Sequence, residues 1–278
     1  MKYKPNYARD DTKIGRGLKK FHLSKKLIVE IKTRLKKNKT LRILEIGCGK
    51  GIVLLELLKI FGNKLELYGL NLNRYHGIKD KKDLIINAKD KDIILSDFDK
   101  RNLPKISFGN AIKLPYNENY FDIVISNVTF VHIKNKAKAL ENVYRVLKLR
   151  GIAFLQLDSY MTEYTFKGKI PGLYTRLNKK YQKNYLPRFM IGKECIPIKD
   201  FSKFFETQGI KIKVIRAPFK DKLKEGVGYA VIFWKSSDML KFNLIYDKEK
   251  SERLTKFMRS KNPIVYGVID VYKGKTNY

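Results

Sequence analysis

Three alternate glycines stand directly after an apolar segment, and their spacing is typical of a loop that binds a ligand. The segment Leu41–Ile46 is followed by Gly47, Gly49 and Gly51, and a helix-like apolar run over 52–60 begins at once. This order predicts a buried parallel strand, a tight loop and a helix whose free N–H groups face the loop. Glycines let a ligand approach the backbone closely and tolerate positive φ. The pattern therefore indicates a nucleotide-type binding site.

Polar side chains also stand at the ends of other predicted strands. Glu45 lies near the end of the first strand, and Asn71, Asn110 and Ser126 end or closely follow three further apolar runs. Doubly wound parallel sheets bind their ligands beyond the carboxyl ends of the strands. The convergence of four such positions predicts one ligand site at that edge of the sheet.

A histidine and a cysteine are further candidates for chemistry. His132 follows the predicted strand over 121–126, and its unperturbed pKa near neutrality suits a general base. A histidine that only packs after this strand is the simpler interpretation. Cys48 is expected to fill a tight turn rather than to act as a nucleophile. The two cysteines, Cys48 and Cys195, cannot form a disulfide framework, and the sequence holds no Cys/His cluster typical of a metal site.

Alternating strands and helices must position these residues. Strands are expected at 42–46, 65–70, 105–108, 121–126, 152–157, 210–215 and 227–234, and helices at 24–37, 52–61, 83–88, 135–147 and 199–207. Ser24 is the expected N-cap of the first helix, Gly62 the C-cap of the second, and Gly151 the stop before the fifth strand. The alternation predicts an α/β fold with a doubly wound parallel sheet.

Residues 158–197 interrupt this alternation with interleaved aromatic and basic side chains. Leu173, Leu177, Tyr181 and Tyr185 recur every four residues, which predicts a helix. Because the segment follows the fifth strand, it is expected to lie over the carboxyl edge as a helical cap. The aromatic residues expected to line a substrate space there are Tyr160, Tyr164, Tyr174 and Tyr181. Aromatic side chains at helical spacing are, however, more often part of a core.

The whole chain has 278 residues, which suits one large domain with additions. We expect a basic N-terminal segment and helix over 1–40, the main domain over 41–235 and a C-terminal extension over 236–278. No apolar run approaches the roughly 20 residues of a membrane span, and Met1–Pro5 lacks a signal-peptide core. The cytoplasm is the expected compartment.

The formal net charge of +33 raises nucleic acid as a partner. The charge is spread widely, however, and comes mainly from lysine, whereas specific phosphate and base recognition favours arginine. Nucleic acid is therefore the weaker alternative to a small-molecule substrate.

Several motifs together resemble one enzyme family. Glu45-x-Gly47-x-Gly49-x-Gly51 resembles motif I of the class I S-adenosylmethionine (SAM) dependent methyltransferases. Phe121-Asp-Ile-Val-Ile-Ser-Asn with the following His132-Ile133 is similar to the strand-4 motif of the ubiquinone/menaquinone-type members, and 140–151 resembles their next helix and turn. The resemblance covers about 41–235, except the cap. It implies a Rossmann-like seven-stranded sheet with an antiparallel seventh strand, and SAM as cofactor.

The resemblance also implies a set of cofactor-binding residues. Glu45 and the glycine loop would surround the methionine part of SAM, and Ser126 and Asn127 would lie near the sulfonium. Asn71 and Asn110 stand where the family usually has acids for the ribose hydroxyls and the adenine amino group. Because an amide carries no charge, weaker SAM binding is expected, and Asn71→Asp is predicted to bind SAM more tightly. The complete set is Glu45, Gly47, Cys48, Gly49, Gly51, Asn71, Leu72, Asn110, Ala111, Ser126 and Asn127.

The implied activity is methyl transfer to an O, N or C atom of a small or medium organic metabolite. Two alternatives stay open: an RNA or protein methyltransferase that uses the basic N-terminus and cap, and a SAM-fold binding module that has lost activity. An NAD(P) oxidoreductase is disfavoured because the loop lacks Gly-x-Gly-x-x-Gly.

Overall fold

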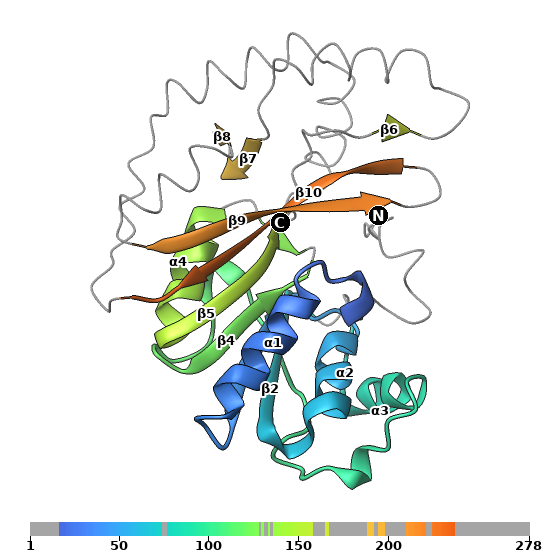
Figure 1. The fold of residues 1–278 in the computed structure, drawn as a ribbon. Helices are drawn as coiled ribbons and strands as arrows, with labels where there is room; N and C mark the ends of the chain where they lie inside the picture. The colour runs from blue at the N-terminus through green and yellow to red at the C-terminus, as the bar shows by residue number, and fades with distance from the viewer. Residues whose placement is uncertain are drawn as a thin grey trace.

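A computed structural model describes residues 17–73, 77–127, 129–130, 133, 136–157, 165–166, 188–191, 194–197, 210–220 and 224–236. One central sheet organises these residues, and helices lie on both of its faces (Figure 1). Among the described residues, no helix is long and apolar enough to cross a membrane.

The sheet has eight strands: seven lie in the spatial order β3-β2-β1-β4-β5-β10-β9, and the two-residue β6 (Thr165–Phe166) also pairs with β10. The first five positions pair in parallel, and β10 runs antiparallel to both β5 and β9. The predicted seven-stranded sheet with an antiparallel last strand is therefore confirmed. The strands are β1 (Leu41–Ile46), β2 (Leu65–Asn71), β3 (Lys105–Phe108), β4 (Phe121–Ser126), β5 (Leu147–Leu157), β9 (Lys211–Lys220) and β10 (Lys224–Trp234).

Helices cover the sheet because each has one apolar face to bury. On one face, Leu27 and Leu57 join Ile43 in a core cluster, and on the other face Leu140 joins Leu44. The helices are α1 (Ser24–Leu35), α2 (Ile52–Phe61), α3 (Lys81–Lys89) and α4 (Lys136–Val146), with short 3-10 turns η2 (Leu18–Lys20), η3 (Gly62–Lys64), η4 (Leu95–Asp97) and η5 (Ala111–Lys113). This double layer fixes the carboxyl ends of β1, β2 and β4 beside one another.

One helix cap was predicted correctly from the sequence, one was predicted wrongly and one was not predicted. Gly62 is the C-cap of α2 with φ 58°, as predicted. The predicted N-cap Ser24 is wrong, because Leu23 occupies the cap position of α1 and no side chain caps it. Asp80, which the sequence did not single out, caps α3 by accepting from the N–H groups of Lys82 and Asp83.

The start of β5 differs from the prediction that Gly151 precedes this strand. The strand already begins at Leu147, and Gly151 lies inside it. Arg150 adopts φ 63°, and the register with β4 shifts between Phe121 and Ile123. Lys235 donates to the Gly151 carbonyl at 3.0 Å, and its own carbonyl accepts from Arg150 at 2.9 Å. These sheet-type contacts continue the strand through a turn-like backbone.

Short strands are the described parts of the predicted cap. They are β6 (Thr165–Phe166), β7 (Arg188–Ile191) and β8 (Glu194–Pro197); β6 pairs with β10, and β7 pairs with β8 in a separate sheet. The predicted helical cap is thus not confirmed. The helix expected near Leu173–Tyr185 lies outside the described residues, as do the helix over 199–207 and the termini 1–16 and 237–278.

Candidate active site

The glycine loop joins β1 to α2 in a left-handed backbone conformation. Gly47, Gly49 and Gly51 have φ values of 72°, 53° and 71°. A Cβ on Gly47 would collide with the side chain of Thr129, whereas a Cβ on Gly49 would have no atom within 4 Å. Gly49 therefore faces open space at the end of the strand, where a ligand can approach the backbone.

Backbone hydrogen bonds hold the base of this loop against β2. The N–H groups of Gly47 and Cys48 both donate to the Leu70 carbonyl, at 2.7 and 3.2 Å. Cys48 is 6% exposed. Burial raises the pKa of its thiol well above the usual value, and nearby Glu45 adds to the shift. The thiol therefore stays protonated, as expected of a cysteine that packs in a turn.

Glu45 and Asn127 bring unsatisfied polar atoms to the same edge. Glu45 is 2% exposed, and its Oε2 atom has no hydrogen-bond partner in the described part of the chain. Burial raises the pKa of this carboxyl well above its usual value, with a smaller contribution from Glu56. Neither Oδ1 nor Nδ2 of buried Asn127 has a partner within the same residues. Since buried polar groups are normally paired, both side chains indicate a place for a polar ligand.

Asn71 and Ser126 come from neighbouring strands and bond to the backbone. Asn71 is 3% exposed, and its side chain accepts from the backbone N–H of Gly49 and donates to the Gly49 carbonyl. Ser126 is fully buried and donates from Oγ to the Ile46 carbonyl at 3.0 Å. Both predicted site residues thus lie beside the loop, and their polar atoms support its strands.

Asn110 lies one strand further along the edge. Gly109 donates to the Asn71 carbonyl at 2.9 Å, which places the start of the Asn110 turn beside the end of β2. The Asn110 side chain accepts from the Ile112 N–H at 3.1 Å and caps η5, while Ala111 is buried. Leu72 is 49% exposed.

The predicted residues therefore divide into two groups. The structure brings together Glu45, the glycine loop, Asn71, Ser126 and Asn127, with Asn110 adjacent. His132 and the four cap tyrosines Tyr160, Tyr164, Tyr174 and Tyr181 lie outside the described residues. Their assignment stays a prediction.

Residues 44–155 match the family model described as a methyltransferase domain. This match supports a class I SAM-dependent methyltransferase domain over this segment. The matched residues run from β1 through β5 and so include the glycine loop and the polar edge described above.

Three curated proteins illustrate the relatives of this methyltransferase domain. The ubiquinone/menaquinone biosynthesis C-methyltransferase of Rickettsia prowazekii is 32% identical over 112 residues, which are 39% of this chain and 41% of that protein. The malonyl-[acyl-carrier protein] O-methyltransferase of Bacillus cereus is 26% identical over 138 residues, 49% of this chain and 44% of the relative. The glycine/sarcosine/dimethylglycine N-methyltransferase of Actinopolyspora halophila is 27% identical over 137 residues, 49% and 22% of the two chains. The chain thus spans less than half the length of each.

Among solved structures, a SAM-dependent methyltransferase from Methanosarcina mazei aligns with a TM-score of 0.47 at 16% identity, over 71% of this chain and 93% of that one. The fold of the methyltransferase domain is established by its own strand order rather than by this likeness.

The structure also adds residues to the loop of the methyltransferase domain that the sequence did not reveal. Thr129 donates from Oγ1 to the Gly47 carbonyl at 3.3 Å, and the Ile78 N–H donates to the Gly49 carbonyl at 2.9 Å. Thr129 stands two residues after Asn127, so its place in the strand-4 motif was an available signal. Gly77 and Ile78 lie in a charged stretch without clear periodicity, and no sequence signal marks them.

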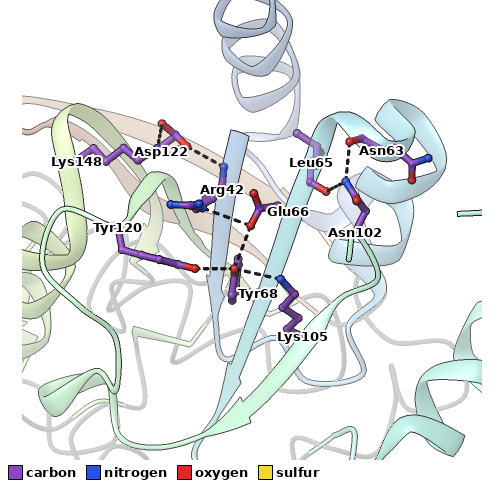
Figure 2. Close-up of polar contacts among 10 residues, drawn as sticks. All are labelled: Arg42, Asn63, Leu65, Glu66, Tyr68, Asn102, Lys105, Tyr120, Asp122 and Lys148. Carbon is purple, nitrogen blue, oxygen red and sulfur yellow. Dashed lines mark hydrogen bonds and ion pairs between the residues drawn. The ribbon is translucent and has the colours of Figure 1, made fainter. Parts of the chain in front are cut away.

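A connected polar cluster of the methyltransferase domain lies at the amino ends of the strands (Figure 2). Tyr68 bonds Tyr120 through their hydroxyl groups at 2.8 Å and donates to Glu66 at 3.2 Å. Asp122 accepts from the Arg42 N–H at 2.8 Å and forms an ion pair with Lys148. These contacts join β1, β2 and β4 far from the glycine loop, so they belong to the scaffold.

Proposed function

We propose that the chain is a SAM-dependent methyltransferase that methylates an O, N or C atom of a small or medium organic metabolite. The observation that carries this proposal is the open face of Gly49 beside the unpartnered polar atoms of Glu45 and Asn127. Within the described residues, no group of three His, Cys, Asp or Glu side chains is arranged to hold a metal ion.

The residues at this edge fit the methionine end of SAM. The open backbone at Gly49 offers space, and the buried Glu45 carboxyl offers an acceptor for the ammonium group of the cofactor. Asn127 offers both a donor and an acceptor near the end of β4. When bound, SAM supplies an electrophilic methyl group for a nucleophilic atom of the substrate. The chain's own contribution is to orient the cofactor and exclude water.

The names of the relatives support a small-molecule substrate, whereas the net charge of this chain favours RNA. One relative is named for methylating glycine, sarcosine and dimethylglycine, and the three relatives include a C-, an O- and an N-methyltransferase. The net charge of +33 favours RNA as a second candidate substrate. The site geometry supports methyl transfer in both cases, because acceptor specificity on such folds comes from loops and added segments.

Labelled SAM and a cell extract test both the activity and the substrate class. We expect label to enter the small-molecule fraction when the full chain is present. Label in RNA or protein would instead support the corresponding alternative, with binding to tRNA at rising salt as a second measurement. The absence of SAM binding by calorimetry would overturn the proposal.

A matched pair of glycine variants tests the site itself. Gly49 and Gly62 both have positive φ, at 53° and 58°, and a Cβ on either would have no atom within 4 Å. Gly49→Ala and Gly62→Ala thus both place a side chain on a positive-φ residue without a steric clash. We expect only Gly49→Ala to weaken SAM binding, by about tenfold or more, because its methyl group enters the proposed cradle. Equal affinities in the two variants would contradict this placement.

His132 is proposed as a general base on its sequence position alone. We expect His132→Ala and His132→Gln to lower turnover by about a hundredfold if the histidine removes a substrate proton. Near-unchanged turnover would leave it a packing residue.

A further inference from the structure

The side chain of Asn71 bonds both the backbone N–H and the carbonyl of Gly49, as the backbone of a neighbouring strand would. Its Oδ1 accepts from the Gly49 N–H at 2.8 Å, and its Nδ2 donates to the Gly49 carbonyl at 3.0 Å. Both contacts join residues 22 positions apart in the chain, from the end of β2 to the middle of the loop. A carboxylate has no donor, so an ionised Asp cannot make the second bond.

A second segment holds the same Gly49 carbonyl. The Ile78 N–H donates to the Gly49 carbonyl at 2.9 Å. Gly77 lies so close that a Cβ on it would collide with this carbonyl. We call these contacts of Asn71, Gly77 and Ile78 to the Gly49 peptide the Gly49 clamp.

The clamp matters because it acts on the one loop glycine that faces open space. A glycine backbone has many accessible conformations, and ordering it on binding costs free energy. The clamp fixes the Gly49 peptide before any ligand arrives. Both polar atoms of the Asn71 amide are already bonded to Gly49, whereas Oε2 of Glu45 has no partner among the described residues.

We propose that Asn71 is a positioning residue, which shapes the glycine loop for the cofactor by clamping Gly49. The part of this inference that concerns SAM rests on the proposed function. It differs from the role that the family resemblance implies, in which the side chain at this position bonds the ribose. In this chain the amide is the required group, and a carboxylate is a poor substitute.

The two roles predict opposite effects of Asn71→Asp. Direct ribose binding predicts tighter SAM binding by the charged variant. The clamp predicts binding about tenfold weaker or more, because the variant loses the donor to the Gly49 carbonyl and places a negative charge beside it. Protonation would restore a donor to Asp, so the affinity of the variant should approach that of the wild type as the pH falls. Glu45 and Cys48 are buried nearby but titrate in both proteins, so the ratio of the two affinities isolates position 71.

Nuclear magnetic resonance of the ligand-free full chain tests the clamp without the cofactor. We expect the Gly49 N–H and the Asn71 side-chain NH₂ to exchange slowly with solvent, and the Gly49 signal to shift in Asn71→Asp. Fast exchange of both groups would overturn the clamp. If the clamp is seen but the wild type binds no SAM, the proposed function fails and the clamp stands.

A second variant keeps the test decisive should Asn71→Asp fail to fold. Gly77→Ala displaces the other side of the clamp, and Gly62→Ala provides a control with positive φ and open space around its Cβ. Calorimetry should show SAM binding about tenfold weaker in Gly77→Ala and little changed in Gly62→Ala. SAM affinity in Gly77→Ala equal to the control, or tighter binding by Asn71→Asp, would overturn the positioning role.

Discussion

The carboxylate of Glu56 on α2 accepts a hydrogen bond from the backbone N–H of Leu18 at 2.6 Å, across 38 residues of the chain. Its other oxygen accepts from Lys91 at 3.0 Å. A Cβ on Gly17 would collide with the same carboxylate. One partly buried acid thus joins the start of the described chain, the helix that follows the glycine loop and the segment after α3.

Removal of this acid should loosen that junction. We expect Glu56→Ala to lower the free energy of unfolding by about 1–3 kcal/mol, because a buried N–H and an ion pair lose their partner. Urea denaturation measures the change. Glu30→Ala is the control, since Glu30 pairs with Arg34 one helical turn away on the surface of α1. The control should lose less than about 0.5 kcal/mol, and equal losses would contradict the prediction.

Glu45 should make the stability of the protein depend on pH. The folded state holds the proton of this buried carboxyl to a higher pH than the unfolded state does. Between the unfolded value, roughly 4.3, and the raised folded value, the folded state binds more protons, so stability falls as the pH rises. Glu45→Gln should remove this slope and raise the melting temperature at neutral pH, by an amount set by about 1.4 kcal/mol per pKa unit.

Thermal melts at several pH values measure that slope, and calorimetry on the same samples measures SAM binding. We expect Glu45→Gln to be more stable at neutral pH yet weaker in SAM binding, because the Glu45 carboxyl can release its proton and become a charged partner of the ammonium group, whereas the amide stays neutral. A melting curve for the variant with the same pH slope as the wild type would contradict the buried, unpartnered state of Glu45.

Tyr68 offers a prediction in which stability changes and binding does not. Its hydroxyl contacts Tyr120 at 2.8 Å, Glu66 at 3.2 Å and Lys105 at 3.3 Å (Figure 2). Tyr68→Phe removes these contacts and should lower the free energy of unfolding by about 1–2 kcal/mol. Since the cluster lies at the amino ends of the strands, SAM affinity should stay within about twofold of the wild type. A larger loss of affinity would show that the two edges are coupled.

The sequence was sufficient where local patterns and burial agree. The bounds of α2 follow from a mainly apolar run between Gly51 and Gly62, and β4 follows from the apolar run Ile123–Ile125 with Phe121 before it. The start of β5 was missed because Gly151 looks like a stop, while its strand contacts come from Lys235, distant in the chain. The helix that aromatic spacing predicted in the cap lies outside the described residues, while the described strands β6, β7 and β8 were missed because short segments cannot be assigned to strand without their pairing partners.

In the candidate site too, the sequence predicts the positions of the residues but not the contacts of their side chains. The glycine spacing and the polar strand ends were enough to predict that Glu45, Asn71 and Ser126 meet at one edge. They could not predict what each side chain bonds. The family resemblance directed Asn71 towards a ribose, whereas in the structure its amide bonds Gly49, a contact that depends on the folded shape of the loop.

Gly69 and Cys48 offer a test of how β2 supports the glycine loop. A Cβ on Gly69 would lie 2.6 Å from Cys48 Sγ and 2.8 Å from Ile106 Cδ1, so Gly69→Ala should overpack this contact. We expect a loss of about 1–3 kcal/mol in the free energy of unfolding and weaker SAM binding, because Cys48 moves with the loop. Cys48→Ala removes the nearest atom, so the double variant Gly69→Ala/Cys48→Ala should recover part of both losses. The double-mutant cycle measures this coupling, and strictly additive effects on stability and affinity would mean that Gly69 does not act on the loop through Cys48.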